Sequence, residues 1–150
     1  MMRVTTSRWA QLATLGQAHW FFGNLYEAVV DVPRLTAAKS EPGLLAPGSP
    51  VRYFAPAAPV TIASTAAALA GSWREGGDRR AIVTAAAGMA AAIGITAYLV
   101  RAVTVTLLKR QPNQAEREEL ARRWHRGNLV RLALLIVVRF AFRRATADRR

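Results

Sequence analysis

The sequence predicts an all-α protein: a four-transmembrane-helix antiparallel bundle with an interfacial amphipathic helix before helix 4. Of the 150 residues, 52% are hydrophobic, and the charged residues cluster between long uncharged runs. Such runs are typical of membrane helices, because about 20 apolar residues are needed to cross the hydrocarbon. The length fits a single integral membrane domain, residues 1–150.

The charge balance is strongly basic, with 21 Lys and Arg against 9 Asp and Glu and a net charge of +12. On a soluble protein this excess would indicate nucleic-acid binding. Here the basic residues flank apolar runs, where they anchor helix ends at anionic headgroups. We therefore expect an integral protein of the cell membrane, with the lipid bilayer as its partner and no nucleic acid.

The first two spans are predicted from the absence of charge. Residues 9–30 contain no Asp, Lys or Arg and form the first span. A connection rich in Pro and Gly follows, and residues 54–73 form an uncharged second span. Its prolines, Pro56 and Pro59, lie in the first turns, where a helix tolerates proline best.

The third span, residues 81–108, follows a short charged turn, and Arg101 is its only charge. Two interpretations of Arg101 stay open: it lines a pocket, or it snorkels to the interface. Next, Asn113 and Glu116 have the spacing of a capping box, which predicts a helix start. The amphipathic segment 114–126 is expected to lie at the interface and to break at Gly127.

The fourth span, residues 127–142, completes an arrangement in which the candidate functional residues meet on one side of the membrane. Charged side chains at membrane depth usually face a bundle interior and mark functional sites. His19 lies about 12 Å deeper than Glu27 on a similar helix face. At or near one depth, the predicted topology places Asn24, Glu27, Tyr53, Tyr98, Arg101, Trp124, Asn128 and Arg131.

Glu27 and Arg131 are the expected ion pair, because either charge alone at this depth would cost about 2–4 kcal/mol. With Arg101 nearby, the site would be a net-positive, aromatic-lined pocket for a hydrophobic anion. Alternatively, Glu27, Asn128 and Arg131 form a structural clamp that fixes the helix register. His19 is likewise either a base or a satisfied buried histidine.

Metal chemistry finds little support, because the sequence has only two histidines, His19 and His125, which belong at different depths. A non-haem iron triad needs two histidines and a carboxylate at one ion. The absence of cysteine excludes disulfides and thiolate metal sites. We expect no metal and no cofactor.

Two short motifs resemble the anthrone-oxygenase-like family of small integral membrane proteins. They are the segment 23–27 late in the first span and the set of Trp124, Asn128 and Arg131 that opens the fourth. The resemblance covers about residues 10–140. It implies a four-helix membrane protein that oxidises an aromatic anthrone with molecular oxygen and no cofactor. Trp124, Asn128 and Arg131 would then line the site.

The resulting hypothesis is a cofactor-independent oxygenase of a hydrophobic hydroxyaromatic substrate. His19 or Glu27 would remove a proton, and Asn128 and Arg131 would stabilise the resulting enolate. The alternative is a non-enzymatic membrane subunit or a binder of a hydrophobic anion. Partners are thus an aromatic or anionic small molecule and, as an open alternative, further copies of the chain. Lys and Arg are balanced across the membrane, and we favour cytoplasmic termini.

Overall fold

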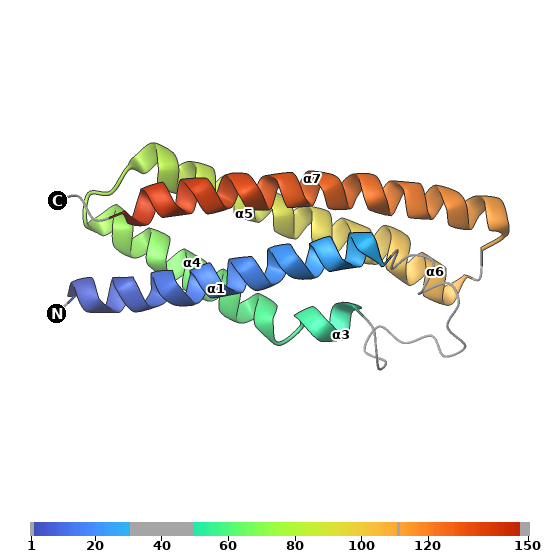
Figure 1. The fold of residues 1–150 in the computed structure, drawn as a ribbon, viewed down its shortest axis with the longest axis horizontal. Coiled ribbons are helices and arrows are strands. Elements are labelled where there is room, and N and C mark those ends of the chain that lie inside the picture. Colours follow the sequence, from blue (N-terminus) through green and yellow to red (C-terminus); the bar gives the residue numbers. More distant parts are fainter. Residues whose placement is uncertain (1, 31–49, 111, 148–150) are drawn as a thin grey trace.

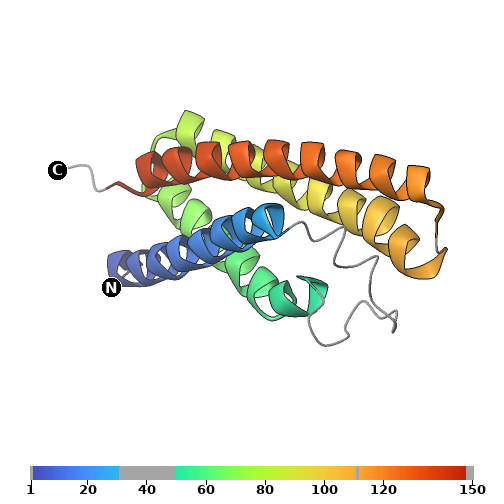
Figure 2. The same cartoon turned by 45° about the vertical axis from the view of Figure 1, so that its right-hand side comes forward.

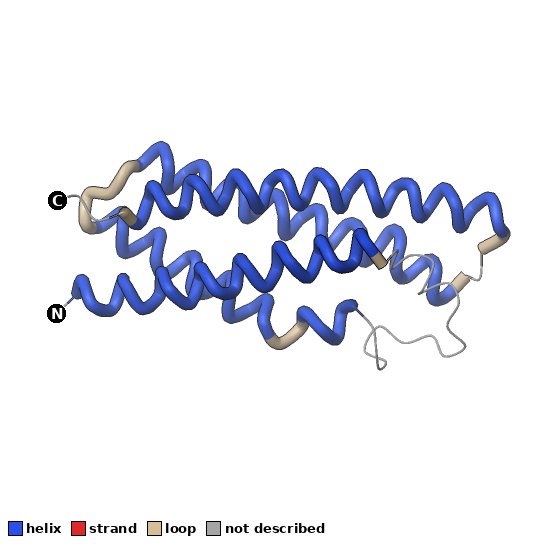
Figure 3. Tube along the Cα trace, viewed as in Figure 1, coloured by secondary structure: helices blue, strands red, loops and turns tan. Residues whose placement is uncertain are grey.

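The computed structural model describes residues 2–30, 50–110 and 112–147, and these are all-α, as predicted. Long helices run alternately in opposite directions, and the two termini lie at the same end (Figure 1). Short turns join them where the described chain is continuous, as the tube in Figure 3 shows. The helices are α1 (Met2–Val29), α3 (Pro50–Phe54), α4 (Ala57–Arg74), α5 (Arg79–Leu99), η1 (Val100–Thr104), α6 (Val105–Lys109) and α7 (Gln114–Thr146).

The most extensive packing is within two pairs of helices, α1 with α4 and α5 with α7. Both pairs remain side by side when the molecule is turned (Figure 2). Glycines allow these approaches, because a side chain at Gly16 on α1 would overlap Thr61 on α4. At Gly127 on α7, a Cβ atom would lie 2.8 Å from a methyl carbon of Leu99 on α5.

One boundary prediction is wrong, because segment 114–126 and the fourth span form a single helix, α7. Gly127 does not break this helix. Because glycine has no side chain, Leu99 of α5 can pack directly against the backbone of α7 at this position. The predicted start is confirmed: Asn113 and Glu116 form a reciprocal capping box.

A π-helical turn, η1, interrupts the third predicted span between α5 and α6. Three buried residues, Leu99, Val103 and Leu107, recur every four positions here and pack with Trp124 of α7. In a regular α-helix each four-residue step rotates the side chain by about 40° beyond a full turn. The wider π turn reduces this drift, so all three residues keep facing α7.

The buried apolar residues form three clusters along the bundle. The cluster at the terminal end joins Ala13, Ala68, Leu69, Ala81, Ile82, Ala85, Phe142 and Ala145. A middle cluster joins Trp20, Met89, Ala92, Leu135 and Val138, and the third, at the other end, joins Leu99, Val103, Leu107 and Trp124.

One helical segment of the described residues is long and apolar enough to cross a membrane. Arg79–Leu107, 29 residues long, has the length and apolar composition to span a bilayer. The other three predicted spans do not pass this test within the described chain. In α1 the polar residues lower the mean hydropathy, and in α7 the arginines exceed the number of charges that the test allows. Four crossings therefore remain a proposal.

Candidate functional site

Arg131 is the centre of a buried polar cluster that joins α1, α5 and α7. Its guanidinium lies 3.4 Å from the carboxylate of Glu27, and both residues are buried, at 5% and 7% exposure. Its Nε and Nη2 atoms donate to Oδ1 of Asn128, at 3.2 and 2.6 Å. Nη1 donates to the hydroxyl of Thr96 at 3.2 Å. The predicted ion pair between Glu27 and Arg131 is therefore present.

Asn128 and Asn24 complete the cluster on the α1 side. The Asn128 amide donates to the backbone carbonyl of Asn24 at 3.0 Å. The Asn24 amide donates to the carbonyl of Trp20 at 2.7 Å, while Oδ1 of Asn24 is buried without a hydrogen-bond partner among the described residues. Both asparagines are fully buried. α1 and α7 are thus held together by side-chain to backbone contacts as well as by the ion pair.

The polar cluster lies between two of the apolar clusters. On α5, Thr96 falls between Ala92 of the middle cluster and Leu99 of the next. On α7, Asn128 and Arg131 likewise fall between Trp124 and Leu135. Apolar layers on both sides reduce the access of water, which strengthens hydrogen bonds and ion pairs within the cluster.

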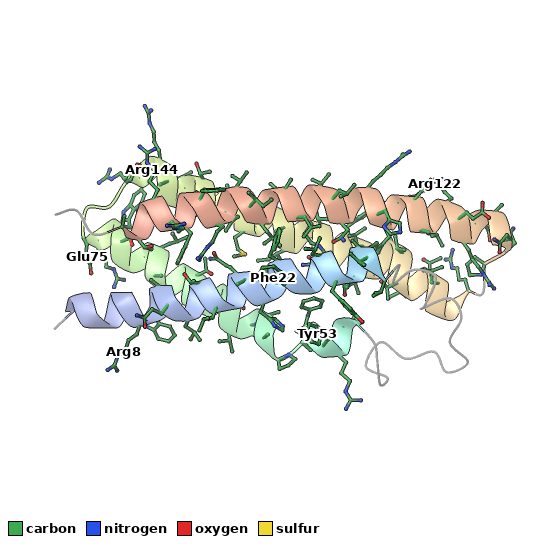
Figure 4. The ribbon with its side chains drawn as sticks, in the orientation of Figure 1. Arg8, Phe22, Tyr53, Glu75, Arg122 and Arg144 are labelled. Atoms are coloured by element: carbon green, nitrogen blue, oxygen red, sulfur yellow. The ribbon has the colours of Figure 1, made fainter. Side chains whose placement is uncertain are left out.

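His19 and Tyr53 lie together, but on another face of α1. The His19 ring stacks on Tyr53 at 4.9 Å between centroids and meets Phe54 edge-on at 5.9 Å. Nε2 of His19 is buried without a hydrogen-bond partner among the described residues. Tyr53 itself is 56% exposed and lies on α3, on the opposite side of the bundle from α7 (Figure 4). These two predicted residues therefore form a separate aromatic group.

The structure does not bring Tyr98 and Arg101 into the cluster. Tyr98 is 52% exposed and Arg101 is also exposed, on the side of α5 and η1 away from Leu99. Arg101 is thus not part of the buried cluster, and both interpretations of its role stay open. Trp124 is buried, but it packs in the apolar cluster with Leu99 and has no hydrogen bond to the polar cluster around Arg131.

Sequence reasoning missed two residues of the bundle interior. Thr96 is one of several threonines in an alanine-rich run, and it stands out only once the buried face of α5 is known. Arg139 lies eight residues after Arg131 in the fourth span, and its Nη1 atom is buried without a partner among the described residues. A charge in that apolar run was the signal that could have identified it.

The structure has a hollow of about 660 Å³ elsewhere, between α6 and the first turns of α7. Arg110, Glu119 and Arg123 are among the residues that line it, and none of the predicted site residues does. Across the described ranges, no three His, Cys, Asp or Glu side chains are placed to hold a metal ion. The buried cluster itself contains a carboxylate, an amide and a guanidinium, from Glu27, Asn128 and Arg131, which can take part in acid–base and hydrogen-bonding chemistry.

Comparison with known families places this geometry in context. A family model described as anthrone oxygenase matches residues 50–140, more than half of the chain. The chain belongs to the anthrone oxygenase family. No curated protein and no solved structure matches it.

The family match covers a shorter part of the chain than the predicted resemblance, which began at about residue 10. It extends from α3 into α7 and so includes Thr96, Asn128 and Arg131. α1, with His19, Asn24 and Glu27, lies outside it. The arginine is therefore part of the matched region, whereas its carboxylate partner is supplied by a helix that the match does not reach.

Proposed function

We propose that this protein is a cofactor-independent oxygenase that acts on a hydrophobic, anthrone-like hydroxyaromatic within the membrane. One observation supports the proposal above all others. A carboxylate, a guanidinium and an amide, from Glu27, Arg131 and Asn128, converge in an apolar interior in a chain of the anthrone oxygenase family. Arg79–Leu107 supplies the membrane-crossing element, and we propose that the other long helices cross beside it.

In the proposed reaction, Glu27 removes a proton from the methylene carbon of the substrate. His19 is the alternative base, although it lies on another face of α1. The negative charge then moves from the carboxylate to the substrate oxygen. Because the neutral acid binds Arg131 less strongly, the guanidinium is free to turn to the enolate oxygen, with Asn128 beside it. The total charge of the cluster does not change during this transfer.

Molecular oxygen is the co-reactant. The carbanion forms a carbon–oxygen bond with O₂, which gives a peroxide at the former methylene carbon. Loss of the second proton from that carbon and cleavage of the O–O bond then produce the ketone and release water. One O₂ is consumed, one of its atoms enters the product, and the substrate carbon supplies the electrons.

Oxygen uptake by the full chain in membranes tests this proposal, with an anthrone as the substrate. We expect Arg131→Leu to abolish turnover. The matched control is Arg122→Leu, on the same helix, where an exposed arginine pairs with exposed Glu119. A folded Arg131→Leu protein with unchanged uptake would remove the mechanism.

A structural role for the cluster is the second candidate, favoured by the hydrogen bonds of Arg131. A guanidinium has five N–H donors, and the structure uses one on Nε, one on Nη1 and two on Nη2. Such saturation is what a helix clamp in a non-enzymatic subunit or hydrophobic-anion binder requires.

A paired variant separates the two candidates. Glu27→Gln combined with Arg131→Gln removes both charges but keeps groups that hydrogen-bond. The oxygenase proposal expects a folded protein without uptake, because neither the base nor the cation remains. Wild-type uptake by this double variant would show that the cluster is structural and that oxygenase chemistry takes place elsewhere. Absence of uptake by the wild-type protein itself would favour the non-enzymatic subunit or binder.

A further inference from the structure

Two buried polar atoms that have no hydrogen-bond partner among the described residues lie one layer away from the Glu27–Arg131 cluster. They are Oε1 of Gln17 on α1 and Nη1 of Arg139 on α7. Gln17 is only 4% exposed, and its Nε2 donates to the hydroxyl of Thr65 on α4 at 3.2 Å. In this orientation of the amide, Oε1 is the end without a hydrogen bond. One atom is an acceptor and the other is a charged donor.

The helix faces indicate that these two groups point toward each other. Gln17 precedes Asn24 by seven residues, so the two lie within about 20° on α1. Arg139 follows Asn128 by eleven residues, which again is within about 20° on α7. Since the Asn128 amide donates to the Asn24 carbonyl, these are the faces on which α1 and α7 meet.

Their heights along the bundle also agree. Gln17 lies about 10 Å from Asn24 along α1, and Arg139 lies about 16 Å from Asn128 along α7. Long helical side chains lean back over the preceding turn, which moves the guanidinium about one turn, roughly 5 Å, toward Asn128. The Arg139 guanidinium and the Gln17 amide are then at nearly the same level.

Apolar residues flank this level on both sides along α1 and α7. Gln17 falls between Ala13 of the terminal cluster and Trp20 of the middle cluster. Arg139 falls in the same way between Phe142 and Val138. Buried polar atoms in native proteins almost always have a partner, and an unpaired one commonly marks an unseen water or ligand.

We propose that Gln17 and Arg139 form a second binding site, whose ligand is a hydroxyl group. A hydroxyl accepts a hydrogen bond from Nη1 of Arg139 and donates its own proton to Oε1 of Gln17, so it satisfies both atoms. A trapped water and the phenolic hydroxyl of an aromatic ligand share this chemistry. The site is separate from the Glu27–Arg131 cluster, and it does not depend on the oxygenase proposal.

Binding of 1-naphthol to the full chain in detergent micelles tests the phenolic source. The matched ligand is 1-methoxynaphthalene, which keeps the oxygen acceptor but cannot donate. We expect Gln17→Leu and Arg139→Met each to weaken 1-naphthol binding at least tenfold. Binding of 1-methoxynaphthalene should be unaffected by Gln17→Leu, because this ligand donates no proton to Oε1, and weakened by Arg139→Met, because its oxygen still accepts from Nη1. Gln11→Leu and Arg143→Met are the control variants, because both residues are exposed on the same two helices.

Nuclear magnetic resonance of the wild-type protein tests the water source and needs no variant. A trapped water should give a cross-peak between water and the Gln17 side-chain amide. In either case the double variant should lose less Tm than the two single variants together, because each single change leaves the other atom unpaired. If the wild type gives no water cross-peak and both variants bind 1-naphthol normally, the proposal is wrong.

Discussion

The α1–α4 and α5–α7 pairs both approach closely at glycines, but through different chemistry. On α1, Gly16 meets the β-branched Thr61, and Gln17 donates to Thr65. On α5, by contrast, Gly127 of α7 meets the flexible end of Leu99, within an apolar cluster. Hydrogen-bonded, branched side chains cannot shift easily, whereas an apolar surface can adjust. The first pair should therefore tolerate changes in shape less well than the second.

Arg131 links the two pairs, so its replacement should have the largest effect on stability. Arg131→Leu leaves the carboxylate of Glu27 buried without a cation, and removing one partner of a buried pair costs about 3–5 kcal/mol. Unfolding in detergent micelles would measure this loss. Adding Glu27→Gln to the same protein should recover part of it, and no recovery would argue against the ion pair.

Matched glycine substitutions test the comparison directly. In Gly16→Ala, the new Cβ overlaps Thr61, whose hydroxyl donates to the Ala57 carbonyl at 2.8 Å, so we expect a loss of about 1–3 kcal/mol. In Gly127→Ala, Leu99 can rotate away from the new methyl group. The higher helix propensity of alanine stabilises the folded protein by about 0.5–1 kcal/mol, which offsets the cost of the close contact. Equal losses for the two variants, measured as Tm, would refute the difference between the pairs.

Loss of the hydrogen bond between α1 and α4 should have a smaller effect. Thr65→Val removes the acceptor of Gln17, so the buried amide then lacks partners at both ends. We expect a loss of about 1 kcal/mol in the free energy of unfolding. Thr84→Val, at an exposed threonine of α5, is the control and should leave stability unchanged.

The smallest expected effect is a pH dependence within the α5–α7 pair. Asp78 accepts hydrogen bonds from the backbone of Ala81 and from Arg144 of α7, which hold the pKa of its carboxyl below the usual value. A depressed pKa in the folded state stabilises the protein above about pH 4 and loses that contribution as the pH falls further.

Thermal unfolding between about pH 5 and pH 2 would measure this dependence. Asp78→Asn keeps the cap but cannot titrate, so its Tm should fall less over that range. Arg144 projects from the terminal end of the bundle in Figure 4, where water screens the pair, which is why the effect should be small. If the Tm of the Asp78→Asn protein fell with pH as steeply as that of the wild type, Asp78 would not be the source of the pH dependence.

The sequence allowed prediction of the helices and of the Glu27–Arg131 pair, because both depend on local patterns and on the cost of burying charge. The positions of Tyr98 and Arg101 could not be predicted in this way. Which face of α5 packs on α7 depends on the π turn and on the glycine at residue 127, and both are set by tertiary contact. The direction of His19 could not be predicted either, since its ring packs against Tyr53 and Phe54 of α3.

The position of the two termini has a practical consequence. α1 begins and α7 ends at the same end of the bundle (Figure 1). If α1, α4, the Arg79–Leu107 segment and α7 all cross the bilayer, as we propose, reporters fused before α1 and after α7 would emerge in the same compartment whichever way the chain is inserted. Complementary fragments of a fluorescent protein, one on each terminus, should then reassemble within a single molecule and reveal by accessibility which side they occupy.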